Sequence, residues 1–227
     1  MPIYHSKKFR ESQLAHQLLD GLQGLEIGGA AHNAFGLDTM NVDRVHHTNL
    51  AFEPYALEQV RLCGEVMPVD IVAPGDKIPV KDGSFDFVIN SHVIEHFYDP
   101  ISAIKEWMRI SRLYVFMIIP QRDALESDKE KPLTPLSEHI ERYHEQQGGT
   151  SDDHHSRWTA ITFREMCEWI FAQDWGKDWI ICAVEYPDKK VGNGFTVVLQ
   201  RAPGYLDAIN KMEEEHRVNS IKKSKRP

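Results

Sequence analysis

The sequence contains few cysteines and no long apolar run. Three of its 227 residues are cysteine, and this odd number without metal-type spacing argues against a disulfide framework and predicts a reducing compartment. The longest apolar run, Val115 to Ile119, is far too short to cross a bilayer. The N-terminus leads into no apolar signal core. These absences predict a cytoplasmic protein that makes no use of a membrane.

Positive charge is also scarce. The chain has 26 Lys and Arg against 34 Asp and Glu, a formal net charge of -8, which disfavours nucleic acid as a partner because such binding neutralises phosphates with cations. The basic residues of segment 218–227 predict only a solvated tail. A length of 227 residues suits one large α/β domain, predicted over residues 1–217.

The most informative stretch is an apolar run that ends at polar side chains. Residues 85–89 are nearly all apolar and follow an Asp82-Gly83 turn, which predicts a strand buried on both faces, as in a parallel sheet. In open α/β sheets ligands bind at the carboxyl ends of the strands. Polar and titratable residues follow this run at once: Asn90, Ser91, His92, Glu95 and His96.

The next two elements complete one crossover unit. Asp99-Pro100 predicts a helix start, because an N-cap acid precedes proline at the first helical position. The apolar segment 113–119 predicts a second buried strand, which Pro120 ends. Strand, helix and strand in this order form a right-handed crossover, so the predicted fold is α/β with a doubly wound, mostly parallel sheet.

Residues 82–100, Asp-Gly-Ser-Phe-Asp-Phe-Val-Ile-Asn-Ser-His-Val-Ile-Glu-His-Phe-Tyr-Asp-Pro, together with their flanks at 78–80 and 103–110, resemble a known family. The segment is similar to the central part of class I S-adenosylmethionine-dependent methyltransferases, in the branch often called type 11. The resemblance covers about forty contiguous residues. It implies a Rossmann-like fold, S-adenosylmethionine as cofactor and methyl transfer as the activity.

The same resemblance implies a cofactor site. The family places an acid and a glycine-rich loop after its first strand, and Glu26, Gly28 and Gly29 fall on the matching positions, although the usual G-x-G-x-G is here Gly-Gly-Ala-Ala-His. Asp43 would end the second strand and accept hydrogen bonds from the ribose hydroxyls; the alternative is a turn residue. Asn90 would end the strand that faces the cofactor.

The adenine contact is harder to place. Segment 78–80, Ile-Pro-Val, corresponds to a Leu-Pro-Phe-like segment of the family and puts Ile78 beside the cofactor. The family's adenine-binding acid precedes that segment, but Pro74 occupies its place here. Asp76 is near and out of step.

After Pro120 the chain becomes polar. Segment 121–158 predicts a lid or substrate-binding insertion, or partial disorder, with a short helix over 136–143 and Trp158 as an anchor. A capping box over 162–165 then predicts a helix through Phe171. Two strands, 179–184 and 195–199, predict a terminal antiparallel pair, and 203–217 a closing helix.

Three other functions are alternatives to methyl transfer. Residues 92–96 match H-x-x-E-H, in which two histidines bind zinc and a glutamate acts as base. That chemistry needs a helix, whereas this motif follows a strand, so a zinc hydrolase using His92, Glu95 and His96 is an alternative and no metal is assigned. The imperfect glycine loop leaves open a catalytically silent adenosyl-binding module. A nicotinamide-dependent oxidoreductase is disfavoured because G-x-G-x-x-G/A is absent.

The acceptor is predicted from the histidines. A hydroxyl acceptor needs a base, and the ordinary pKa of histidine, near ~6.5, suits that task at cellular pH. We therefore expect O-methylation of a small-molecule or glycan hydroxyl. His92 is the leading base candidate, with His139 and His155 as alternatives.

Overall fold

The structure is a computed structural model that describes residues 9–29 and 35–204. Its centre is a seven-stranded sheet with the order β3-β2-β1-β4-β5-β7-β6. Strands β1 to β5 pair in parallel, while β7 runs antiparallel to both β5 and β6. The predicted doubly wound, mostly parallel sheet is confirmed. Its strands are β1 Gln23–Ile27, β2 Asp38–Asp43, β3 Ile71–Val72, β4 Phe85–Ser91, β5 Ser111–Pro120, β6 Trp179–Glu185 and β7 Gly194–Arg201.

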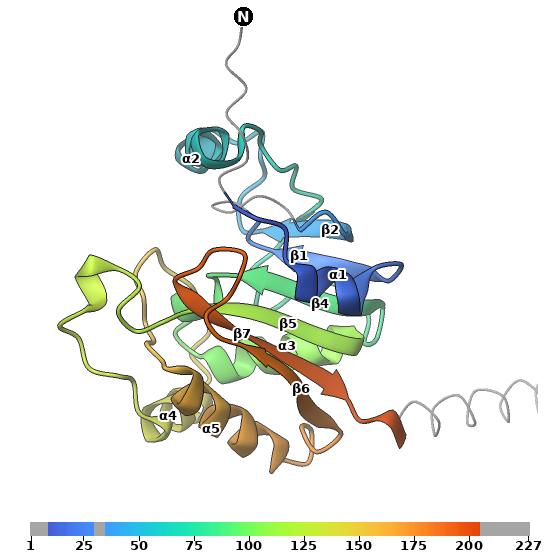
Figure 1. Ribbon diagram of the computed structural model, residues 1–227, viewed down its shortest axis with the longest axis vertical. Coiled ribbons are helices and arrows are strands. Elements are labelled where there is room, and N and C mark those ends of the chain that lie inside the picture. The colour runs from blue at the N-terminus through green and yellow to red at the C-terminus, as the bar shows by residue number, and fades with distance from the viewer. Residues whose placement is uncertain (1–8, 30–34, 205–227) are drawn as a thin grey trace, which may run out of the picture.

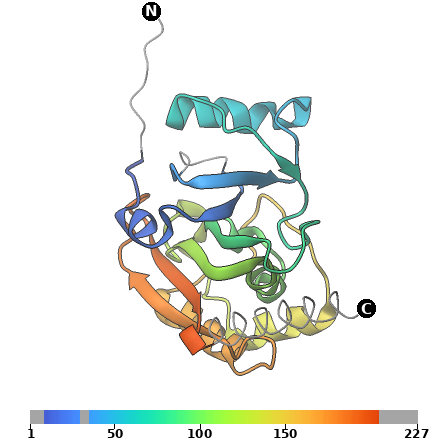
Figure 2. The same ribbon diagram turned by 90° about the vertical axis from the view of Figure 1, so that its right-hand side faces the viewer.

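Helices cover both faces of the sheet (Figures 1 and 2). On one face α1 packs against apolar side chains of β4, β5 and β7. On the other, α3, α4 and α5 form a larger core around Trp107, Trp158 and Phe163. Helix α2 stands beyond β2, at the far end of the molecule from α4 and α5 (Figure 1). The helices are α1 Gln13–Leu19, α2 Glu53–Cys63, α3 Pro100–Ile110, α4 Leu136–Glu145 and α5 Ala160–Phe171.

Local signals explain the crossover from β4 to β5. The Asp99 side chain accepts a hydrogen bond from the Ser102 N–H at 3.0 Å and Pro100 occupies the first turn, which satisfies one of the free donors of the helix start. Strand β4 runs on through Ser91, one residue beyond its predicted end at Asn90, so Asn90 lies inside the strand. The strand order reverses between β1 and β4, and at such a switch point the carboxyl ends of two strands open a crevice.

Two other predictions changed in detail. Helix α5 is capped by Thr159, whose capping box is made with Thr162, three residues before the predicted one. Strand β5 begins at Ser111, two residues before the predicted start. Segment 121–158 contains α4 and a 3-10 turn at Glu126–Asp128, and Trp158 is fully buried as expected. The predicted closing helix lies, from residue 205 on, outside the described residues.

Among the described residues, no helix combines the length and the apolar character that crossing a bilayer requires.

Candidate functional site

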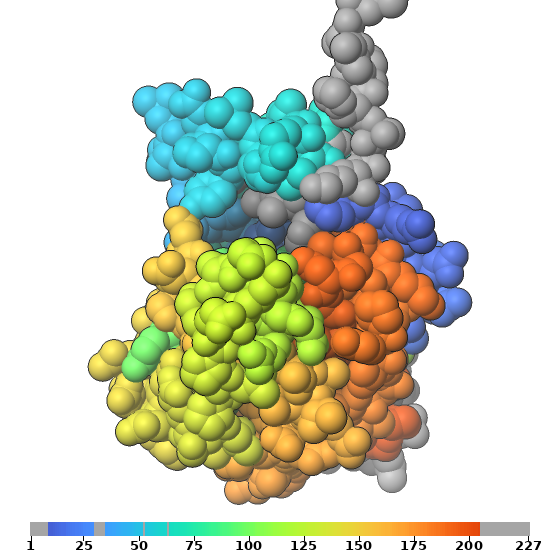
Figure 3. Space-filling view, turned by 60° about the vertical axis from the view of Figure 1, so that its left-hand side comes forward, coloured from blue at the N-terminus to red at the C-terminus, as the bar shows by residue number. Residues whose placement is uncertain are grey.

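A cavity of about 300 Å³ opens at the carboxyl edge of the sheet, where the strand order reverses. Figure 3 shows a hollow between the cyan segment that includes α2 and the yellow-green part of segment 121–158. Volumes of this order suit small-molecule ligands. The cavity is lined by Ile27, Gly28, Val42, Asp43, Arg44, Tyr55, Ala73, Gly75, Ser91, His92, Val93, His96, Phe97, Thr150, Ser151 and Asp152.

Glycine is required where β1 ends. Gly28 has φ +64° and donates its N–H to the carbonyl of Val42 at 2.9 Å. A Cβ on Gly28 would lie 3.0 Å from a methyl group of Val93, and one on Gly29 would lie 2.4 Å from the sulfur of Met67. Residues with side chains rarely adopt such positive φ angles. The backbone of Gly28 is therefore exposed to the cavity without a side chain in between.

The last residue of β2, Asp43, presents a carboxylate to the cavity. The side chain is half-buried, and one oxygen accepts a long hydrogen bond from the Val45 N–H at 3.3 Å. Burial raises the pKa of this carboxyl above its ordinary value, although the Arg44 charge opposes that effect. A half-buried acid beside a cavity is suited to accept hydrogen bonds from ligand hydroxyls.

An ion pair links the two sides of the cavity mouth. Arg44, just after β2, pairs with Asp152 of segment 121–158 and donates to the Tyr55 hydroxyl of α2 at 2.6 Å. That hydroxyl also donates to Asp152 at 3.1 Å. These three residues join segments distant in sequence, and no local signal predicted that they would meet.

His92 lies immediately after β4 and lines the cavity. Its φ is +54°, a value that costs a residue with a side chain roughly 1–3 kcal/mol and is most often found at functional sites. Its N–H donates to the Ile118 carbonyl of β5 at 2.9 Å, which anchors the strained backbone. The loop thus presents an imidazole at the same edge as Gly28 and Asp43.

Comparison with known proteins agrees with this geometry. A family model described as "Methyltransferase domain" matches residues 25–116. Residues 25–116, from β1 into β5, are thus similar to a methyltransferase domain. A SAM-dependent methyltransferase from Methanosarcina mazei has the same fold, with 16% identity and a TM-score of 0.50 over 84% of this chain and 97% of that one. The PH0226 protein from Pyrococcus horikoshii OT3 is also 16% identical, with a TM-score of 0.51 over 83% of this chain and 85% of that one. No curated protein matches the chain.

S-adenosylmethionine is the cofactor of this enzyme class. The residues that line the cavity are suited to such a molecule. It combines exposed backbone at Gly28, a carboxylate at Asp43 and apolar walls from Ile27, Val42 and Val93. Methyltransferase chemistry needs little more than a cavity that holds donor and acceptor in line.

Glu26 is buried beneath the glycine turn and does not line the cavity. Burial raises its pKa to about 7, and the charge of the nearby Lys190 partly offsets this. The Lys190 ammonium is itself buried and lies 4.3 Å from the centre of the Phe35 ring. The Glu26 carboxylate accepts hydrogen bonds from the Phe35 N–H and the Thr39 hydroxyl.

Besides Glu26, five predicted site residues do not line the cavity: Gly29 and the four described next. Asn90 is fully buried within β4. The N–H of Ile78 donates to Glu106 at 2.7 Å, so Ile78 belongs to the packing against α3. His139 is 1% exposed and stacks on Trp158, with ring centres 5.1 Å apart, and burial lowers its pKa to about 3. His155 stands behind the lining residue Ser151, which it contacts at 2.8 Å.

Asp76 and Glu95 are the two other acids that the sequence pointed to. Asp76 accepts a hydrogen bond from the Gly149 N–H at 3.1 Å and lies outside the cavity lining. Glu95 and His96 lie in a 3-10 turn that begins at Ile94, and His92 precedes that turn with left-handed backbone. The helical zinc-hydrolase arrangement is therefore not formed.

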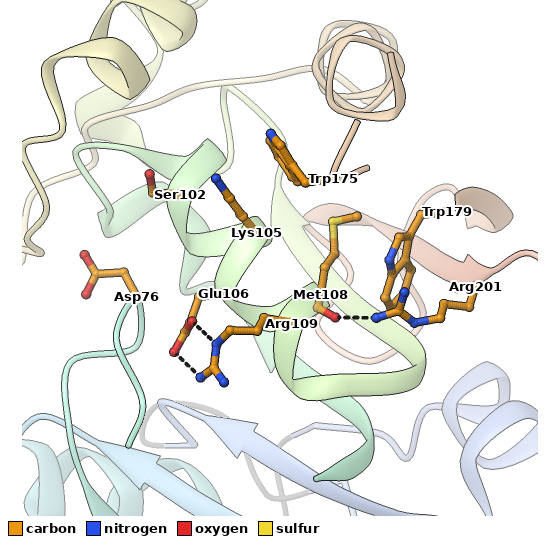
Figure 4. Close-up of a pocket in the computed structure, with 9 residues that line it drawn as sticks. All are labelled: Asp76, Ser102, Lys105, Glu106, Met108, Arg109, Trp175, Trp179 and Arg201. Atoms are coloured by element: carbon orange, nitrogen blue, oxygen red, sulfur yellow. Dashed lines mark hydrogen bonds and ion pairs between the residues drawn. The ribbon is translucent and has the colours of Figure 1, made fainter. Parts of the chain in front are cut away.

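A second, larger cavity of about 460 Å³ runs along the outer side of α3 (Figure 4). Within it Glu106 pairs with Arg109, and Arg201 donates a hydrogen bond to the Met108 carbonyl at 3.2 Å. The Lys105 ammonium lies 4.9 Å from the centre of a Trp175 ring. This groove lies beside α3 and includes neither Gly28 nor Asp43.

Proposed function

We propose that this methyltransferase transfers the methyl group of S-adenosylmethionine to a hydroxyl oxygen of a small molecule or glycan, with His92 as general base. The carrying observation is that His92 shares one cavity with Gly28 and Asp43. The other two histidines considered for this role, His139 and His155, do not line it.

Asp43 and Gly28 would hold the cofactor. The carboxylate of Asp43 would accept hydrogen bonds from ribose hydroxyls, and the open backbone at Gly28 would allow the ligand to approach closely. Ala73 and Gly75 leave room in the wall on the β3 side. When bound, S-adenosylmethionine supplies a methyl group that its sulfonium makes electrophilic.

The protein must also remove the proton of the acceptor hydroxyl. A neutral hydroxyl is a weak nucleophile, so a base must take its proton as the new carbon–oxygen bond forms. His92 supplies an imidazole at the carboxyl end of β4, held by its bond to Ile118. Protonated His92 would then release the proton to water after the methylated product leaves.

A polar acceptor is supported by the outer wall of the cavity. Thr150, Ser151 and Asp152 line it from segment 121–158, and such side chains hydrogen-bond hydroxyl groups readily. The ion pair between Arg44 and Asp152 joins this wall to the cofactor side. Segment 121–158 would therefore carry acceptor specificity.

The test is a turnover assay on a panel of sugars, polyols and phenols, with S-adenosylhomocysteine as the measured product. The His92→Ala variant should lose roughly 10²–10⁴-fold in turnover while its affinity for S-adenosylmethionine stays within about twofold. His144→Ala, an exposed histidine of segment 121–158, is the matched control and should behave as wild type. Full turnover by His92→Ala would refute the base, and cofactor binding without turnover on any acceptor would favour a silent module.

A further inference from the structure

A cluster of three ligand-type side chains lies at the edge of the cavity and has no part in the proposed methyl transfer. Glu95 and His96 come from the turn after β4, and His154 comes from segment 121–158. The Nε2 atoms of His96 and His154 lie 3.8 and 3.9 Å from Oε1 of Glu95. Their ligand atoms all lie within 4.8 Å of one another.

The far side of each imidazole ring is held by a hydrogen-bond acceptor. Nδ1 of His154 contacts the Asp128 carboxylate at 2.5 Å, and Nδ1 of His96 contacts the Asp153 carbonyl at 3.3 Å. Because a carboxylate or carbonyl only accepts, each Nδ1 carries the proton and each Nε2 keeps its lone pair. Both lone pairs are thus available on the side of Glu95. An outer acceptor of this kind accompanies most histidine ligands of metals.

Glu95 itself is the second, independent observation. Its side chain is fully buried, and neither carboxylate oxygen has a hydrogen-bond partner among the described residues. An ionised carboxylate in such a place costs several kcal/mol unless a positive charge compensates it. A bound cation would supply that charge.

We propose that Glu95, His96 and His154 bind a divalent transition-metal ion, with Zn²⁺ as the leading species and Asp128 as the residue that orients His154. Two imidazoles and one carboxylate form a common zinc ligand set, whereas Mg²⁺ prefers oxygen ligands alone. Bonds of about 2.0–2.2 Å place ligand atoms no more than roughly 4.4 Å apart, so the two measured separations need little change.

The cluster lies next to the cavity, and this position matters for its chemistry. His96 lines the cavity as well as the cluster, and an ion with three protein ligands keeps at least one position for water or a substrate oxygen. This site differs from the H-x-x-E-H arrangement weighed in the sequence, because His154 takes the place that His92 would have had. Metal binding here does not depend on methyl transfer and is measured without it.

The experiment uses the full chain without a histidine tag, stripped with a chelator and titrated separately with Zn²⁺, Fe²⁺, Mn²⁺ and Mg²⁺ by calorimetry and thermal shift. We expect one equivalent of Zn²⁺ to bind and to raise the melting temperature. Asp128→Asn should weaken binding about 10- to 100-fold, the usual effect of losing an outer partner. His154→Ala should weaken it further, and His144→Ala should leave it unchanged.

Glu95→Gln guards against variants that fail to fold. It removes the charge but keeps the shape, so the metal-free variant should be at least as stable as wild type while its Zn²⁺ affinity drops by more than about tenfold. The proposal is overturned if wild type binds no stoichiometric transition metal. It is also overturned if Glu95→Gln and His154→Ala bind Zn²⁺ as tightly as His144→Ala does.

Discussion

Replacement of Asp43 by asparagine tests the cofactor site most directly. Asparagine keeps the size of the side chain and one carbonyl oxygen, so the hydrogen bond from the Val45 N–H can persist. The change removes the negative charge and one acceptor from the cavity wall. Because Asp43 is only half-buried and its pKa is already raised by burial, we expect the fold to tolerate the neutral residue.

The expected loss of binding free energy follows from the hydrogen bonds that the substitution removes. A hydrogen bond to a charged group contributes about 1.5–3 kcal/mol, and the amide retains a neutral acceptor for the other hydroxyl. Asp43→Asn should therefore weaken S-adenosylmethionine binding by about 1.5–3 kcal/mol, roughly 10- to 150-fold. Asp43→Ala should weaken it further, by less than the sum of two such bonds because neighbouring contacts are not additive.

The assay is calorimetric titration with S-adenosylmethionine and S-adenosylhomocysteine, paired with urea unfolding to confirm that each variant is folded. Asp38→Asn changes an exposed acid at the other end of the same strand and is the matched control. Binding by Asp43→Asn and Asp43→Ala that equals the control would show that Asp43 is only a turn residue, and the assignment of the ribose site would fall.

Two further predictions concern buried groups. Burial raises the pKa of Glu26 from 4.5 to about 7. The stability that its protonated carboxyl contributes is therefore complete below the unfolded-state pKa and is lost as the pH rises through about 7. Glu26→Gln should therefore gain on the order of 3 kcal/mol relative to wild type between about pH 5 and pH 8 in urea unfolding, and parallel pH profiles would contradict this. His139→Phe keeps the stack on Trp158 and removes two buried ring nitrogens without hydrogen-bond partners among the described residues, so stability should hold or rise with turnover unchanged. Loss of turnover in the folded variant would instead make His139 the base.

Local sequence signals were sufficient for the framework. The apolar runs of β4 and β5, the Asp99-Pro100 helix start and the terminal antiparallel pair were all predicted, because burial on both faces and helix capping depend on adjacent residues. The resemblance to class I methyltransferases placed Asp43 at the end of β2, where the structure has it. The glycine turn at Gly28 followed from the local sequence.

Boundaries and side-chain destinations were less well predicted. The cap of α5 was placed one turn late because Thr159 and Thr162 offer competing hydroxyls. Ile78 and His139 were expected at the ligand and instead pack in the interior. A residue type near the right strand does not determine which way the side chain points, since packing against distant elements decides it.

The sequence by itself determined the sheet and the glycine turn, since each rests on contacts or conformations within a few residues, while the resemblance to a known family placed the acid at Asp43. Only the tertiary structure decided that Arg44 meets Asp152 across the cavity mouth and that His154 joins Glu95 and His96. These meetings depend on how segment 121–158 returns over the edge of the sheet. That path is set by the burial of Trp158 and His139 against α5, a long-range packing outcome that no local pattern encodes.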